Sequence, residues 1–167
     1  MAKALLVIDM QEFSVGENHA KVFRYEQALI DKVNQVIEAY QGEFVIYIRN
    51  IMKRNIINKF APFEAYEGTK EIELVNGLHI VSDLCFDKYE ADAFSNSSLV
   101  KFCQDNHIEE MEVIGVDGGG CVALTALGAC KLGYKVLVNM HAIGTVFSGK
   151  QKKFHERLRR MGAIILS

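Results

Sequence analysis

The fold is clearest in residues 111–132, MEVIGVDGGGCVALTALGACKL. The apolar run over 111–115 is typical of a buried strand, and the glycines at 118–120 predict a turn that leads into a helix over 121–132. Cys121 would then lie at the N-terminus of that helix, where the helix dipole and the backbone N–H groups stabilise a thiolate. From this local pattern alone, three interpretations are open: a reactive thiol, an anion-binding loop or a tight turn.

The same alternation of strand and helix begins near the N-terminus. Apolar runs at 4–8 and 44–48 predict two strands that are buried on both faces. Between them Leu29, Val33 and Ile37 recur at helical spacing. Because parallel strands need such a crossover, these segments predict a β-α-β unit.

The rest of the chain predicts the other elements of the sheet. Further strands are expected at 78–81, 135–140 and 163–166, a short extended piece at 84–86, and helices at 97–106 and 150–161. Together the segments predict a three-layer α/β fold, doubly wound, with a mainly parallel sheet of about six strands and helices on both faces. We expect one domain over residues 1–167. Ligands of such sheets bind beyond the carboxyl ends of the strands, and Asp9 and Cys121 both follow such ends.

Composition limits the classes of partner. The chain has 167 residues, of which 50% are hydrophobic and 24% charged, and its formal net charge is −2. This balance provides no basic surface for nucleic acid or an anionic membrane, and the basic residues of 150–160 surround an amphipathic helix as a solvated face. No apolar run reaches the length of a membrane span, and no secretory signal precedes the first strand. We therefore expect a cytoplasmic protein without nucleic-acid or membrane partners.

The cysteines and histidines do not predict a disulfide frame or a metal site. The four cysteines are widely spaced without a CxxC pair, which favours reduced thiols. Cys85, Cys103 and Cys130 lie in or beside apolar segments, and we expect them to pack as small hydrophobic residues. The five histidines are scattered without the spacing of metal ligands.

Three segments carry a family resemblance. In order along the chain they are LVIDMQ at 6–11, DKYEADAF at 87–94 and GVDGGGCV at 115–122. They resemble the motifs of the isochorismatase-like cysteine hydrolases, and the predicted order of strands and helices is also that of the isochorismatase-like, Rossmann-like fold. The resemblance therefore covers nearly the whole chain.

The resemblance implies a catalytic triad. Asp9 would be the general base, Lys88 the cationic partner and Cys121 the nucleophile. The backbone N–H groups of Asp117 and Cys121 would form the oxyanion hole, with a cis peptide bond between Val116 and Asp117. Since a lysine cation and a helix N-terminus both favour a thiolate, we expect Cys121 to have a pKa below that of a free thiol and to be alkylated before the other cysteines.

Departures from the family pattern bear on the reaction. Residues 49–66 contain neither aspartate nor histidine, so the metal site of the nicotinamidase branch is not expected, and no cofactor is predicted. Cys121 is retained, whereas the true isochorismatases commonly lack this cysteine. We therefore expect metal-independent cleavage of a small amide, ureide or related C–N bond through a covalent thioester. The alternatives are an isochorismatase-like hydrolase of a non-amide small molecule and a binding or redox-sensing protein without turnover.

Several residues are candidates for substrate contacts. Phe13, shortly after Asp9, is expected to supply an aromatic wall of the pocket. The side chain of Asp117 either caps its loop or binds a cationic group of the substrate. Arg49 and Arg54 are candidates for binding a substrate carboxylate.

The segment over 51–66 is predicted to cover the active site or to contact a second subunit. Its apolar side chains and the common association of family members favour a homo-oligomer, either a dimer or a tetramer. We expect Phe60, Phe63 or Tyr66 near the subunit boundary; otherwise these aromatic residues fill the core of the monomer.

Overall fold

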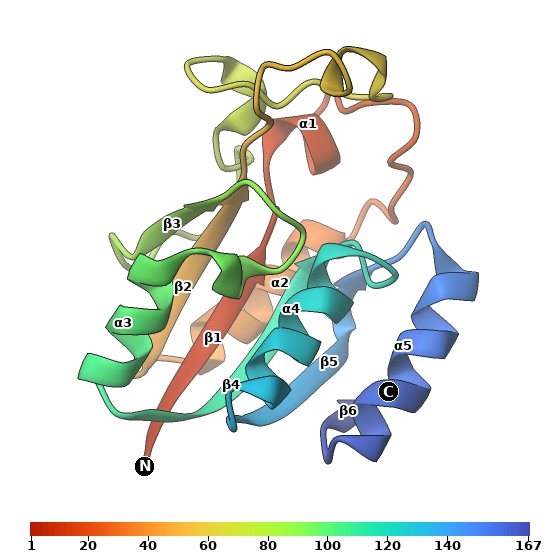
Figure 1. Ribbon diagram of the computed structural model, residues 1–167. Helices are drawn as coiled ribbons and strands as arrows, with labels where there is room; N and C mark the ends of the chain where they lie inside the picture. Colours follow the sequence, from red (N-terminus) through yellow and green to blue (C-terminus); the bar gives the residue numbers. More distant parts are fainter.

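The computed structural model describes residues 1–167 and contains one sheet of six strands in the order β3-β2-β1-β4-β5-β6 (Figure 1). The strands are β1 (Ala2–Ile8), β2 (Phe44–Asn50), β3 (Cys85–Lys88), β4 (Ile108–Val116), β5 (Lys135–Gly144) and β6 (Ile164–Leu166). Every neighbouring pair is parallel. The predicted α/β fold is confirmed, and the sheet is entirely rather than mainly parallel.

Helices cover both faces of this sheet. They are α1 (Glu12–Val15), α2 (Leu29–Ala39), α3 (Ser97–Asp105), α4 (Cys121–Lys131) and α5 (Ser148–Arg160), with short 3₁₀ helices η1 (Asn58–Phe60), η2 (Lys70–Ile72) and η3 (Ala93–Ser95). Side chains of α2 pack on one face, and those of α3, α4 and α5 pack on the other (Figure 1). No helix has the length and apolar character of a membrane span.

The central strand explains the continuous apolar run at the N-terminus. Residues 4–8 of β1 are completely buried, because β1 lies between β2 and β4 and has helices on both faces. Burial on both faces selects an apolar side chain at every position of such a strand. The carboxyl ends of the strands meet at one edge of the sheet, and the segments with α1, η1 and η2 lie above that edge (Figure 1).

Two sequence predictions are wrong at the β3 edge of the sheet. Residues 78–81 form no strand, because β3 pairs with β2 instead; only Leu78 of this segment is buried, against α2. Cys85 is exposed rather than packed, since β3 is an edge strand with a neighbour on one side only. Cys103 is buried and Cys130 half-buried, as their apolar surroundings predicted.

Candidate active site

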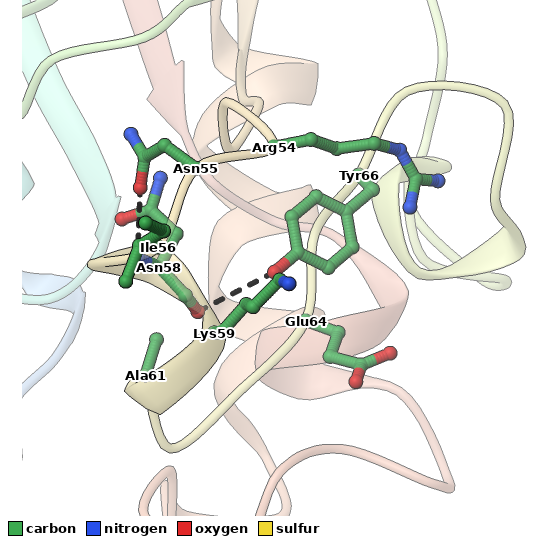
Figure 2. A pocket seen from close by; sticks show the side chains of 8 residues that line it. All are labelled: Arg54, Asn55, Ile56, Asn58, Lys59, Ala61, Glu64 and Tyr66. Carbon is green, nitrogen blue, oxygen red and sulfur yellow. Dashed lines mark hydrogen bonds between the residues drawn. The ribbon is translucent and has the colours of Figure 1, made fainter.

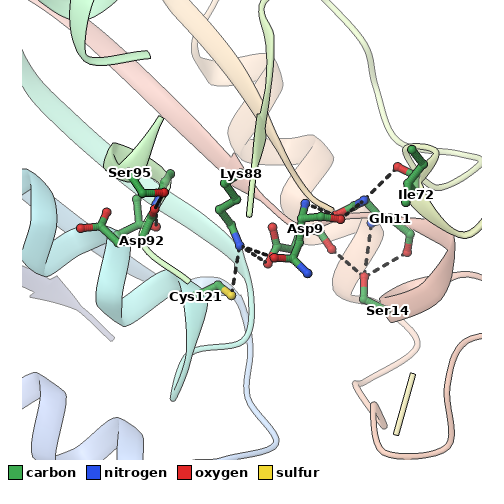
Figure 3. Close-up of polar contacts among 11 residues, drawn as sticks. Asp9, Gln11, Ser14, Ile72, Lys88, Asp92, Ser95 and Cys121 are labelled. Atoms are coloured by element: carbon green, nitrogen blue, oxygen red, sulfur yellow. Dashed lines mark hydrogen bonds and ion pairs between the residues drawn. The ribbon is translucent and has the colours of Figure 1, made fainter. Parts of the chain in front are cut away.

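Three residues far apart in the sequence form one polar cluster at the carboxyl edge of the sheet. Asp9 follows β1, Lys88 ends β3 and Cys121 begins α4. The Nζ atom of Lys88 lies 3.1 Å from Oδ2 of Asp9 and 3.2 Å from Sγ of Cys121 (Figure 3). Asp9 is 4% exposed and Lys88 1%, so the charges lie in a medium where their interactions are strong. We use the name polar cluster for these three residues.

The backbone at Asp9 turns sharply out of the strand. Its φ of 51° lies in the left-handed region, which aspartate tolerates better than most residues. The N–H of Asp9 donates to the carbonyl of Ile48 at 2.9 Å, and the Ser14 hydroxyl donates to the carbonyl of Asp9 at 2.6 Å. These contacts on both sides fix the direction of the carboxylate toward Lys88.

Lys88 has a third partner that the sequence did not predict. Its Nζ atom lies 3.1 Å from Oδ1 of Asn50, so the ammonium has one acceptor for each of its three donors. Asn50 is held in turn by the fully buried side chain of Gln11. The Oε1 atom of Gln11 accepts from the backbone N–H of Asn50 at 2.7 Å, and its Nε2 atom donates to the carbonyls of Asn50 and Ile72. The only available signal was the glutamine at the end of the first motif, LVIDMQ.

The Asp117 side chain caps the loop before Cys121. Its Oδ1 atom accepts from the N–H of Gly119 at 2.7 Å, and its Oδ2 atom accepts from the N–H of Val146 at 2.5 Å and from the Tyr25 hydroxyl at 3.2 Å. The Asp117 carboxylate accepts all three of these hydrogen bonds within the chain, so the capping interpretation is confirmed. A glycine is required at 119, since a Cβ atom there would lie 2.1 Å from the carbonyl oxygen of Phe147.

The backbone around this loop has two features that the family resemblance implied. The peptide bond between Val116 and Asp117 is cis, as expected. The backbone N–H groups of Asp117 and Cys121 have no hydrogen-bond acceptor within the chain. Both groups therefore remain available to a ligand beside the thiol.

Burial dominates the ionisation of the polar cluster. Burial, followed by the Asp9 carboxylate, raises the pKa of the Cys121 thiol to about 12, and Lys88 offsets only part of this effect. The expectation of a pKa below that of a free thiol is therefore wrong. Desolvation penalises the thiolate more than the lysine cation favours it, and the thiol is protonated at neutral pH.

The other two members of the polar cluster also have raised pKa values. Burial raises the pKa of the Asp9 carboxyl, and Lys88 and Cys121 offset this only in part. Burial alone would lower the pKa of Lys88, but Asp9 and Cys121 together raise it above its ordinary value. Lys88 is therefore a cation over the whole neutral range.

A cavity of about 180 Å³ opens beside Asp9 and Cys121. Its apolar lining is mostly aromatic. The aromatic residues come from α1 and from loops, and we call this set the aromatic wall: Phe13, Phe23, Tyr25, Phe63 and Phe147. Phe13 stacks on Phe63 with ring centroids 5.1 Å apart and meets Phe23 edge-on at 5.7 Å. The placement of Phe13 agrees with the sequence prediction, whereas the other four residues were missed because no motif or periodicity marks them.

Neither arginine candidate reaches this cavity. Arg49 forms a two-bond ion pair with Asp87, at 2.7 and 2.9 Å. Arg54 lies over the ring of Tyr66, 4.6 Å from its centroid, and lines a separate surface pocket of about 460 Å³ (Figure 2). No lysine or arginine side chain lines the cavity beside Cys121. The prediction that Arg49 or Arg54 binds a substrate carboxylate there is therefore not supported.

The site has no set of side chains suited to a metal ion. No group of three or more His, Cys, Asp or Glu side chains lies close enough to hold one. The positions directly after β2, where the nicotinamidase branch has metal ligands, begin with Ile51 and Met52. The metal of that branch does not fit the residues present.

Comparison with known proteins gives a consistent result. The model of the isochorismatase domain family matches residues 3–167. No curated protein matches the chain. An isochorismatase-like hydrolase from Alkaliphilus metalliredigens is similar in structure, with 20% identity, a TM-score of 0.83 and coverage of 99% of this chain and 95% of that one.

Two similar structures are amidases by name. The nicotinamidase/pyrazinamidase from Bacillus subtilis has 19% identity and a TM-score of 0.85, and the alignment covers 100% of both chains. N-carbamoylsarcosine amidase from Thermoplasma acidophilum has 22% identity and a TM-score of 0.83, with 99% of this chain and 96% of that one covered. At these identities the structural likeness establishes the fold.

Proposed function

The chain belongs to the isochorismatase domain family, and from this membership we propose that it is a metal-independent cysteine hydrolase of a small amide, ureide or related C–N bond. The observation that carries the proposal is the position of Lys88 Nζ, 3.1 Å from Asp9 and 3.2 Å from Cys121 beside a cavity. A nucleophile and a base that both lie within hydrogen-bond reach of one cation are the parts that covalent acyl transfer requires. That two of the similar structures are amidases supports cleavage of an amide.

The first step transfers a proton and forms a bond. Because the Cys121 thiol is protonated at rest, a base must remove its proton as sulfur attacks. Asp9 is the base: its Oδ1 atom is buried and has no hydrogen-bond partner within the chain, and burial raises its pKa, which makes it a stronger proton acceptor. The Sγ–H electron pair forms the bond from sulfur to the acyl carbon, and the carbonyl π electrons move onto oxygen.

The developing oxyanion is stabilised by the backbone N–H groups of Asp117 and Cys121, which have no acceptor within the chain. Lys88 stabilises the negative charge that passes between sulfur and Asp9. The tetrahedral intermediate then breaks its C–N bond, and the departing nitrogen takes the proton from Asp9. Water attacks the resulting thioester, Asp9 accepts a proton from it, and the acid product and the Cys121 thiol are released.

Trapping the thioester tests this function. A panel of small primary amides and ureides is incubated with the protein and quenched in acid, and the Cys121 peptide is examined by mass spectrometry while ammonia is assayed. We expect an adduct whose mass is that of the acyl group, together with ammonia release. The Cys121→Ala variant is the control, and wild-type rates of ammonia release from it would contradict the proposal.

The cavity also favours a hydrolase over a binding or redox-sensing protein. A binding protein that had lost turnover would not need Asp9, Lys88 and a thiol assembled beside an accessible cavity. A redox sensor needs a thiol with a low pKa, whereas the pKa of Cys121 is raised to about 12. The four free cysteines support a cytoplasmic location, which stays a prediction.

We also propose that the chain forms a homo-oligomer, either a dimer or a tetramer. Ile56, Ile57 and Phe60 are all exposed on one segment, and Phe60 is 85% exposed, which is unusual for a monomer surface. Phe63 and Tyr66 pack instead within the chain. Light scattering tests the proposal: a stable monomer of 18.8 kDa would contradict it, and Phe60→Ser is expected to weaken the association.

A further inference from the structure

The side chain of Asn50 has a fixed orientation at the end of β2. Its Oδ1 atom accepts from Lys88 Nζ at 3.1 Å, and an ammonium can only donate hydrogen bonds. The amide therefore turns its oxygen toward Lys88 and its nitrogen away. Gln11 binds both the N–H and the carbonyl of Asn50, so the backbone beneath this amide is also held.

The Nδ2 atom of Asn50 donates no hydrogen bond within the chain, although Asn50 lines the cavity. The hydroxyl groups in the same lining are used within the chain: Ser14 donates to the carbonyl of Asp9, and Tyr25 donates to Asp117. Apart from the thiol of Cys121, Asn50 thus provides the one side-chain donor of the lining that has no acceptor. Around it the cavity is aromatic.

We propose that Asn50 determines specificity by donating a hydrogen bond from Nδ2 to an acceptor on the acyl group of the substrate. The substrate class is then a small, flat, uncharged amide with a ring nitrogen, ether oxygen or second carbonyl near the scissile bond. This inference rests on the proposed function, because it names the substrate of the same site. A site built to hydrogen-bond a substrate group rejects the analogue that lacks it, since the bound analogue shields the amide nitrogen from water and leaves it unpaired.

Size and charge support the same class. A volume of about 180 Å³ is that of about six water molecules, which suits a single small ring. The parallel stacking of Phe13 and Phe63 provides flat surfaces for such a ring. The one cation near Cys121, Lys88, is already paired with Asp9, and no lysine or arginine lines the cavity itself, so an anionic acyl group finds no free cation there.

The test varies the position of one hydrogen-bond acceptor, a ring nitrogen, among ligands of nearly the same shape. Benzamide and the three pyridinecarboxamide isomers are compared as protectants of Cys121 against iodoacetamide, with the Cys121 peptide quantified by mass spectrometry. At least one isomer is expected to protect three- to tenfold better than benzamide, about the effect of one neutral hydrogen bond. Rates in each protein are normalised to its own unprotected rate.

Variants assign the preference to Asn50. In Asn50→Asp an oxygen remains for Lys88 but the donor is lost, so the preference for the pyridine isomer over benzamide is expected to vanish. Asn50→Ala removes both groups and gives a second measurement should Asn50→Asp fail to fold. Phe147→Leu is the matched control: it alters the same lining without removing a donor, and should weaken protection by isomer and benzamide equally.

The inference is overturned if the isomers protect no better than benzamide, including the case in which none protects, or if the preference survives in both Asn50 variants. Protection requires no turnover, so the two proposals fail separately. A preference that depends on Asn50 without any hydrolysis would overturn the proposed function alone. Hydrolysis of amides with no effect of Asn50 on selectivity would overturn this inference alone.

Discussion

The polar cluster and the aromatic wall face the same cavity but are built in different ways. Asp9, Lys88 and Cys121 lie at the ends of regular elements and are held by charge contacts of 3.1 and 3.2 Å. Phe13 and Phe63, by contrast, have apolar contacts, which include stacking on each other with ring centroids 5.1 Å apart, and Phe63 lies on an irregular segment. Under the proposed function, strand and helix ends hold the reacting groups, whereas α1 and the loops line the space for the substrate.

The largest expected effect is on turnover by the polar cluster. Asp9→Asn and Lys88→Met should each lower kcat by about 10²- to 10⁴-fold, the usual contribution of a positioned proton-transfer group, while leaving the protein folded. Steady-state kinetics on the substrate found by trapping, with thermal unfolding as a check, measures this. Wild-type kcat in either variant would remove that residue from the mechanism.

The second effect concerns the pKa of Cys121, where the two substitutions should act in opposite directions. In the wild type, alkylation of Cys121 is expected to accelerate with pH without a plateau until about 12. Asp9→Asn removes a charge that raises this pKa, so labelling should become faster although turnover is lost. Lys88→Met removes a charge that lowers it, so labelling should become slower.

The same shift predicts the sign of a stability change. The folded pKa of Cys121, about 12, lies above the ordinary thiol value of 9.0, so the folded state holds this proton more tightly. The contribution to the free energy of unfolding is fully present below pH 9 and is lost as pH rises toward 12. Denaturant titrations at increasing pH should show that the free energy of unfolding of Cys121→Ala falls less between pH 9 and 12 than that of the wild type. Equal pH dependence in both proteins would contradict the assigned pKa.

A smaller effect is expected for the aromatic wall. Phe63→Ala removes the ring stacked on Phe13 and should raise KM about tenfold with little change in kcat, since the reacting groups are untouched. Glu67→Ala is the control, because Glu67 lies close to Phe63 in the sequence but is exposed and does not line the cavity. A loss of kcat in Phe63→Ala as large as that in Lys88→Met would contradict the assignment of turnover to the polar cluster and of substrate binding to the aromatic wall.

The smallest effect is expected from chelators. Since no group of His, Cys, Asp or Glu side chains near the cavity suits a metal ion, treatment with EDTA should leave kcat and the melting temperature unchanged. Elemental analysis of the purified protein provides the independent measurement. Finding one equivalent of zinc, iron or manganese, together with loss of activity when the metal is removed, would show that residues of the aromatic wall or the polar cluster bind a metal ion.

The parts of the fold that the sequence predicts correctly are those marked by a local pattern of apolar residues and glycines. The apolar run of β1 and the strand, glycine turn and helix around Cys121 were correctly predicted, because burial on two faces and the turn leave direct marks on the sequence. Residues 78–81 include Leu78, Ile80 and Val81 but form no strand, since β3 takes the place beside β2. Which of two competing segments pairs with an edge depends on the rest of the sheet.

By itself, the sequence determined the order of the elements and the three residues of the polar cluster, through motifs that resemble a known family. Only the tertiary structure decided that Asn50 completes the contacts of Lys88, that loop aromatics enclose the cavity, and that the Cys121 pKa is raised rather than lowered. The physical reason is that hydrogen-bond partners and desolvation depend on atoms from distant parts of the chain. Residue type and spacing predict which group can react, but its neighbours in space set its charge and its ligand.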